Sequence, residues 1–249
     1  MNLDKNSSVL GRLLEELSWT GSTIKSYRTG GRGFENVLTA EVFQALDFLP
    51  RQAFLGAIIE ASQGAAKARA LLGQEIEQAE FTLLPGNHYL IPSATRHQTR
   101  LGVQPDGLIQ SPSCYALLEA KRMKQSSFQP QQLAREFVLV MREARERQPL
   151  LWLVLGSEPP VSVQGHGRLG FPDAIELYLE SVLTRAQNHN LEKTQLLEQV
   201  DEVVSWTTWQ TIAEVVREQA QSIATGDPST AACISRLTDS VIRSVSWHS

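Results

Sequence analysis

Residues 104–121 read QPDGLIQSPSCYALLEAK and are the most informative stretch of this chain. Two short apolar runs flank a turn at residues 110–113, a pattern typical of two β-strands joined as a hairpin. Asp106 interrupts the first run, and Glu119 and Lys121 interrupt the second. Because side chains alternate faces along a strand, Glu119 and Lys121 share one face, and the hairpin brings Asp106 close to Glu119. Burying such charges is expensive unless a metal ion or a reaction uses them, so this face is predicted to be a functional site.

The residues alone leave a second interpretation open. Glu119 and Lys121 would then form a surface ion pair on an edge strand of an ordinary α/β hairpin. Such a pair contributes little to stability.

The spacing Pro105-Asp106-Gly107, followed by Glu119-Ala120-Lys121, resembles the motif of the PD-(D/E)XK nuclease superfamily, whose fold is shared with many restriction endonucleases. The resemblance covers residues 31–156 and leaves out the last third. It implies an α/β fold of the restriction endonuclease type: a sandwich with a central mixed β-sheet flanked by helices. A helical C-terminal extension is expected to follow in this chain.

The resemblance also implies the roles of individual residues. Divalent Mg²⁺, or Mn²⁺ as a substitute, would be bound by Asp106, Glu119, the Ala120 carbonyl and Glu35. Lys121 would hold the attacking water or stabilise the charge of the transition state. Gln132, or else Gln131, would orient the water or hold a phosphate. Glu136 and Phe137 stand near the place where some branches of the family have a tyrosine.

Glu35 has a simpler explanation as well. It lies in the first turn of a helix predicted for residues 34–46, where the helix dipole favours a carboxylate. Glu41 is a second candidate on the same helix. The sequence leaves open both the role of Glu35 and the choice between Glu35 and Glu41.

The net charge of −4 argues against strong unaided binding to a polyanion, yet the charge is unevenly distributed. From Pro172 onward there are eleven acidic and five basic residues, a balance of −6, whereas the rest of the chain has sixteen acidic and eighteen basic residues, a balance of +2. Basic residues gather in sequence around the predicted site, as a groove that cradles phosphates would require. Ordinary solvated loops would also explain them. The residues in question are Lys25, Arg28, Arg32, Arg96, Arg100, Arg122, Lys124 and Arg135.

Three parts of the chain differ in their pattern. Residues 1–30 include a predicted amphipathic helix at residues 8–18, residues 31–160 hold the nuclease-like core, and residues 161–249 are predicted to be a helical extension packed on the core or on a partner. Within the core, residues 51–72 are predicted to form one helix and residues 75–84 the first strand. The apolar run at residues 150–155 is typical of a strand buried on both faces. In the extension, residues 164–170 are predicted to be a glycine-rich loop and residues 191–223 to be helical.

The resemblance implies a metal-dependent endonuclease, and DNA is expected as its substrate in preference to RNA. Target choice would come from a partner, such as a helicase or ATPase subunit of a bacterial defence or repair system. Two alternatives remain: a catalytically silent nuclease-fold scaffold or nucleic-acid-binding subunit, and an unrelated α/β enzyme acting on small phosphates. Homo-oligomerisation is left open. The chain shows neither a signal core nor a window long enough to span a bilayer, so a cytoplasmic location is expected.

Overall fold

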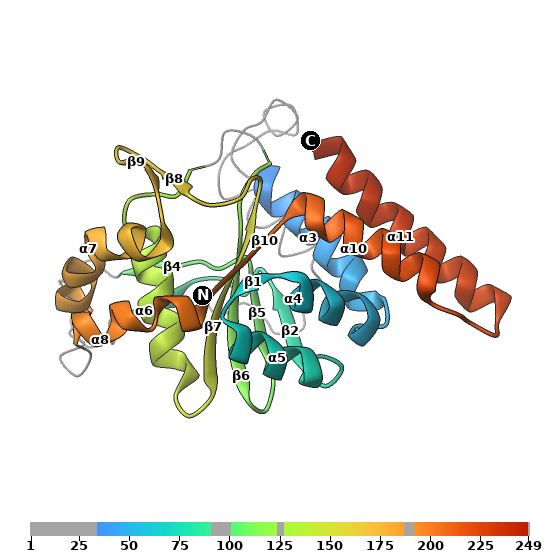
Figure 1. The fold of residues 1–249 in the computed structure, drawn as a ribbon, viewed down its shortest axis with the longest axis horizontal. Helices are drawn as coiled ribbons and strands as arrows, with labels where there is room; N and C mark the ends of the chain where they lie inside the picture. Colours follow the sequence, from blue (N-terminus) through green and yellow to red (C-terminus); the bar gives the residue numbers. More distant parts are fainter. Residues whose placement is uncertain (1–33, 91–100, 124–126, 187–191, 249) are drawn as a thin grey trace.

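The computed structural model describes residues 34–90, 101–123, 127–186 and 192–248, with the backbone alone for residues 34 and 35. The predicted helix at residues 8–18 therefore lies outside the described residues. Six strands form a central mixed sheet in the order β1-β10-β7-β6-β5-β2 (Figure 1). The strands are β1 (Gln63–Gly64), β2 (Glu80–Leu83), β5 (Gly107–Gln110), β6 (Cys114–Ala120), β7 (Gln148–Leu155) and β10 (Val204–Thr208).

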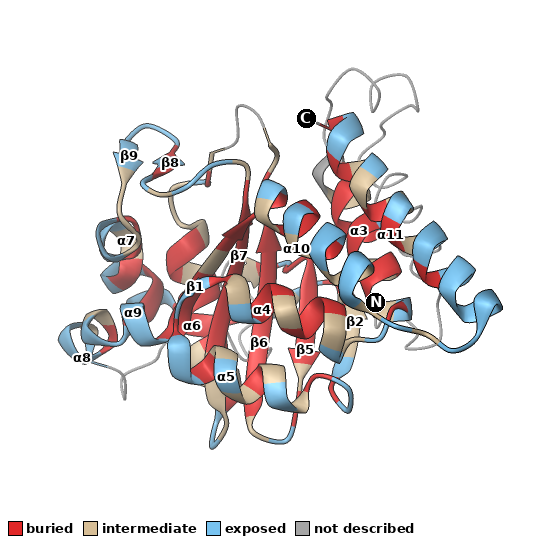
Figure 2. Ribbon diagram, turned by 45° about the vertical axis from the view of Figure 1, so that its right-hand side comes forward, coloured by how far each residue is buried: buried red, intermediate tan, exposed pale blue. Residues whose placement is uncertain are grey.

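The predicted hairpin is confirmed. Strands β5 and β6 pair antiparallel, with Gly107 opposite Leu118 and Gln110 opposite Tyr115. Strand β7 then pairs in parallel with β6, which places β6 in the interior of the sheet. All residues of β6 and the last six residues of β7 are buried, as the continuous apolar run predicted. Figure 2 shows this concentration of buried residues along the central strands.

Helices cover both faces of the sheet (Figure 1). One face packs against α6 (Gln132–Ala144), which in turn packs against α7 (Phe171–Arg185). The other face packs against α3 (Phe34–Phe48), α4 (Ala57–Ala61), α5 (Ala66–Glu75) and α10 (Trp209–Ser222). Alternation along the strands assigns their side chains to these two layers: Leu117 packs on the α6 side and Leu118 on the α3 side. This coarse architecture, an α/β protein with a helix-flanked mixed sheet, confirms the expected layers.

The single helix predicted for residues 51–72 is wrong. The chain instead forms a short π-helical segment, η1 (Gln52–Gly56), then α4, the two-residue strand β1 and α5. Gly64 makes the break: its φ is +73°, and a Cβ at this position would lie 2.4 Å from the carbonyl oxygen of Val204. Only glycine allows this close approach of β1 to β10. Helix α5 continues to Glu75, so strand β2 starts later than the predicted residue 75.

The last third of the chain is not purely helical. The predicted loop at residues 164–170 is part of a hairpin formed by β8 (Val161–Val163) and β9 (Gly167–Leu169). Within the predicted helix at residues 191–223, the sequence VSWTT forms β10, which pairs in parallel with β7 and antiparallel with β1. Its β-branched and aromatic residues suit a strand. Residues after 160 thus supply a strand to the central sheet.

Four short elements and one long helix complete the described fold. They are the two-stranded pair β3 (His88–Tyr89) and β4 (Gly102–Val103), and the helices α8 (Lys193–Glu198), α9 (Val200–Val203) and α11 (Pro228–His248). Helix α11 packs along α10 and α3. Among the described residues, no helix combines the length and the apolar character needed to cross a membrane.

Candidate active site

The three motif residues lie on one face of the sheet, beneath α6. Glu119 follows Leu117 by two residues on β6 and aligns with Leu153 of β7, and both leucines belong to the core on the α6 side. Asp106 immediately precedes β5, at the end of the hairpin where Gly107 pairs with Leu118. Its Oδ2 accepts a hydrogen bond of 2.7 Å from the backbone N–H of Ala120. The Asp106 carboxylate therefore reaches the backbone between the other two motif residues.

Glu119 and Lys121 form a buried ion pair. The distance from Lys121 Nζ to Glu119 Oε1 is 2.6 Å, and the two side chains are only 8% and 5% exposed. Because β6 lies between β5 and β7, the alternative of a surface pair on an edge strand is wrong. A buried pair costs desolvation free energy that its mutual attraction barely repays, so stability alone does not explain it.

The structure distinguishes between the two glutamines at the start of α6. Gln132 Nε2 donates to Glu119 Oε1 at 2.5 Å. Gln131 instead accepts from Arg185 of α7, at 3.2 Å between Nη1 and Oε1. Gln132 is thus the glutamine that faces the motif residues.

Glu136 joins this group, although the sequence motif did not include it. Gln132 Nε2 donates its other hydrogen bond to Glu136 Oε1, at 2.9 Å, and Glu136 is 2% exposed. Its Oε2 is buried and accepts no hydrogen bond from any described residue. Burial, and then the negative charge of Glu119, raise the pKa of Glu136 well above its ordinary value. The sequence signal was its position four residues after Gln132, one helical turn along the same face.

Lys121 is fixed through its backbone on both sides. Its N–H donates to the Val154 carbonyl of β7 at 2.7 Å, and its carbonyl accepts from Trp209 Nε1 at 2.7 Å. Trp209 is buried at the start of α10 and belongs to the core on the α3 side of the sheet. The Lys121 ammonium lies 4.9 Å from the centroid of the Phe128 ring. These contacts place the lysine just past the end of β6.

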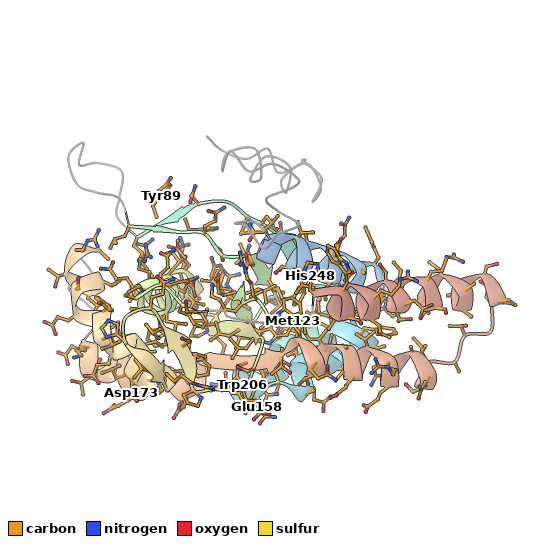
Figure 3. All side chains as sticks on the ribbon, turned by 90° about the horizontal axis from the view of Figure 1, so that it is seen from above. Tyr89, Met123, Glu158, Asp173, Trp206 and His248 are labelled. Carbon is orange, nitrogen blue, oxygen red and sulfur yellow. The ribbon has the colours of Figure 1, made fainter. Side chains whose placement is uncertain are left out.

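The chain then turns toward the opposite layer. Met123 packs against the core on the α3 side, and Figure 3 shows it in the middle of the molecule. Gly156 permits this path, because a Cβ there would lie 2.4 Å from the carbonyl oxygens of both Arg122 and Met123.

Glu35 and Glu41 have different outcomes. The first turn of α3 contains Glu35, but its side chain lies outside the described residues, and its role stays a prediction. Glu41 faces α11, where its Oε2 lies 3.8 Å from His248 Nε2. The interaction with His248 lowers the pKa of Glu41. Glu41 is therefore engaged with the C-terminal helix.

Most of the predicted phosphate-binding residues lie outside the described residues: Lys25, Arg28, Arg32, Arg96, Arg100 and Lys124. Arg122 and Arg135 are described and half-buried. Arg135 donates to the carbonyls of Gly102, at 3.2 Å, and Gln131, at 3.3 Å. It thereby ties α6 to β4, and a contact of its guanidinium with phosphate stays a prediction.

The donor set on this face fits a hard divalent cation. Asp106 and Glu119 supply carboxylate oxygens. The N–H and C=O of one strand residue point toward the same neighbouring strand, and the Ala120 N–H points to Asp106. The Ala120 carbonyl therefore faces the Asp106 side as well. Magnesium commonly takes one or two carboxylates and keeps several waters. Within the described parts of the chain, no group of three or more His, Cys, Asp and Glu side chains could hold a metal ion, and any contribution from Glu35 lies beyond them.

Comparisons of the chain with protein-family models, with curated proteins and with solved structures found no match.

Proposed function

We propose that the chain is a divalent-metal-dependent nuclease that hydrolyses phosphodiester bonds, with DNA as its preferred substrate. One observation carries this proposal: the Asp106 carboxylate is hydrogen-bonded to the β6 backbone between Glu119 and Lys121, which form a buried ion pair inside the sheet. A hairpin that served only for stability would not need charged side chains at these three positions.

Asp106, Glu119 and the Ala120 carbonyl would hold the cation, with Glu35 as a further ligand. When bound, Mg²⁺ or Mn²⁺ supplies a water of lowered pKa and neutralises charge on the phosphate. In the hydrolysis, a water oxygen would form the new bond to phosphorus and lose a proton to solvent, while the leaving sugar oxygen would keep the electron pair of the broken P–O bond and take up a proton from solvent. The products are one terminal phosphate and one hydroxyl group.

Lys121 would stabilise the charge that develops on the phosphate. An ammonium has three N–H donors, so Lys121 can keep its bond to Glu119 while a second donor reaches a phosphate oxygen. Gln132 orients Glu119 through its hydrogen bond to Oε1. The Trp209 bond to the Lys121 carbonyl holds the lysine in place relative to β6.

A plasmid-nicking assay with Mg²⁺ or Mn²⁺ tests the proposal. Glu119→Ala and Lys121→Ala should lower cleavage by at least about 100-fold, since each removes a group that acts on the transition state. Matched controls are Lys193→Ala and Glu176→Ala, which break a Lys–Glu pair on the surface, 3.0 Å apart. Equal cleavage by the wild type and by the site variants would show that these residues are wrongly assigned.

Mn²⁺ binding, measured by electron paramagnetic resonance, supplies a readout that does not depend on cleavage. Binding that requires Asp106 and Glu119, without cleavage, would favour the alternative of a catalytically silent nuclease-fold subunit. Absence of both binding and cleavage would contradict a metal-dependent nuclease. Inhibition of cleavage by free nucleotides at low concentration would point instead to a small phosphate as the natural substrate.

We also propose that a protein partner, such as a helicase or ATPase subunit of a defence or repair system, delivers the DNA. The net charge of −4 supports this, because a polyanion is bound weakly by an acidic chain. The helical part of the last third is the proposed docking surface. Tight binding of DNA by the isolated chain in moderate salt would contradict the need for a partner.

A further inference from the structure

Glu136 is the acidic residue near the motif for which the proposed reaction has no role. It is 2% exposed and accepts a hydrogen bond from Gln132. The helix dipole does not account for it, because the dipole acts within the first turn and Glu136 lies in the second turn of α6. A buried carboxyl group with one hydrogen bond destabilises a fold relative to an apolar side chain. A contribution to stability is therefore a poor explanation for its presence.

The hydrogen-bond geometry gives Glu136 a function through Gln132. A carboxamide nitrogen has two hydrogens, and those of Gln132 are directed to Glu119 Oε1, at 2.5 Å, and Glu136 Oε1, at 2.9 Å. With one acceptor the amide could rotate about its last torsion, whereas two acceptors on different elements fix its plane. The Gln132 Oε1 lies 3.4 Å from the backbone nitrogen of Gln129, which agrees with this orientation. Gln132 thereby connects α6 to β6.

We propose that Glu136 is a positioning residue that acts through Gln132 to fix the orientation of the Glu119 carboxylate. Glu119 Oε1 accepts hydrogen bonds from both Gln132 and Lys121. These bonds fix the orientation of the carboxylate and therefore the direction in which Oε2 is presented to a ligand. The inference rests on the proposed function, because the ligand in question is the divalent cation. Residues that orient metal ligands from behind commonly change metal affinity or activity by about 10- to 100-fold.

Three variants and one control test the inference. Glu136→Leu removes the acceptor and keeps an apolar side chain of similar size, while Glu136→Gln keeps an oxygen that can accept the same bond. Gln132→Ala removes the connecting amide. The control is Glu143→Gln, on the same helix, where Glu143 pairs with Arg142 at 3.0 Å.

Mn²⁺ affinity of the full chain is the first readout, measured by electron paramagnetic resonance. Glu136→Leu should weaken it by about 10-fold. The Mn²⁺ affinity of Glu136→Gln should stay within about 2-fold of the wild type, since the glutamine oxygen still accepts the bond from Gln132. The control should stay within the same range, since Glu143 pairs with Arg142 instead. In a Gln132→Ala background, Glu136→Leu should have no further effect, because Glu136 acts through the amide that is already gone. In DNA cleavage, Glu136→Leu should lower kcat and leave KM unchanged.

A second readout needs no metal. The side-chain NH₂ signals of Gln132 in ¹⁵N spectra, assigned by their loss in Gln132→Ala, should shift in Glu136→Leu and not in the control. Unshifted signals would overturn the inference, as would an effect of Glu136→Leu on Mn²⁺ affinity that is equally large in the Gln132→Ala background. Shifted signals in a protein that neither binds Mn²⁺ nor cleaves DNA would overturn the proposed function, and the positioning role with it.

Discussion

The hydrogen bond from the Ala120 N–H to Asp106 gives one carboxylate two separable roles. The bond is 2.7 Å long, and Asp106 is 7% exposed. Structurally, the Asp106 side chain accepts the hydrogen bond of the Ala120 N–H, in place of a backbone carbonyl from the strand that pairs with β6. Chemically, its negative charge is what a cation requires. Replacement by asparagine keeps an oxygen acceptor and removes the charge, whereas alanine removes both.

The expected effects on stability follow from this bond. Asp106→Ala leaves a buried backbone N–H without its acceptor, which costs about 2 kcal/mol. In a chain of 249 residues, that corresponds to a Tm lowered by about 4–8 °C. Asp106→Asn exchanges a charge-assisted bond for a neutral one, a loss of about 1 kcal/mol that removal of a buried charge near Glu119 offsets. Its Tm should stay within about 3 °C of the wild type.

Differential scanning calorimetry and plasmid nicking, performed on the same preparations, measure the two roles. Both variants should lose metal-dependent cleavage, although only Asp106→Ala loses stability. Asp239→Asn, at an exposed position on α11, controls for removal of an acidic charge. If Asp106→Asn unfolds at as low a temperature as Asp106→Ala, the charge and not the hydrogen bond supports β6, and this reasoning is refuted.

Three further predictions concern single groups. Trp209→Phe should lower the free energy of unfolding by about 1–2 kcal/mol in urea, because the buried Lys121 carbonyl loses its donor; an unchanged value would contradict a role for that bond. The raised pKa of Glu136 means that the folded chain keeps a proton above pH 4.5 that the unfolded chain has lost, so stability falls as pH rises from there. Glu136→Gln should therefore be more stabilising at pH 8 than at pH 5 in urea unfolding, and equal effects would show that the carboxyl is not perturbed. Burial, with the charge of Glu75 second, raises the pKa of Cys114 to about 12, so a disulfide reagent at pH 8 should modify the exposed Cys233 in the native protein and Cys114 only after unfolding.

The hairpin and its site could be predicted from local sequence because each signal lay within a few residues. Alternation placed Glu119 and Lys121 on one face, and the short turn fixed the pairing that brings Asp106 to β6. The apolar run of β7 is buried because neighbours cover both faces. These inferences needed no knowledge of distant parts of the chain.

Other features depend on partners far away in the sequence. The five residues of β10 are too few to outweigh the helical pattern around them, and their strand conformation depends on parallel pairing with β7. Likewise, Glu136 reads as an ordinary polar residue of an amphipathic helix until α6 is placed against β6. The choice between Gln131 and Gln132 also required the rotation of that helix, which packing on the sheet determines.

The placement of β10 changes how the last third of the chain relates to the site. Strand β10 pairs with β7 and leads directly into α10, whose first residue, Trp209, donates to the Lys121 carbonyl. The lysine is thus held by β7 through its N–H and by the start of α10 through its carbonyl. The end of β6 therefore depends on a segment more than 80 residues later in the chain, and β10 and the start of α10 are structural parts of the core. In the proposed reaction Lys121 would act on a phosphate from a fixed position, because β7 and α10 hold its backbone and the bond to Glu119 restricts its long side chain.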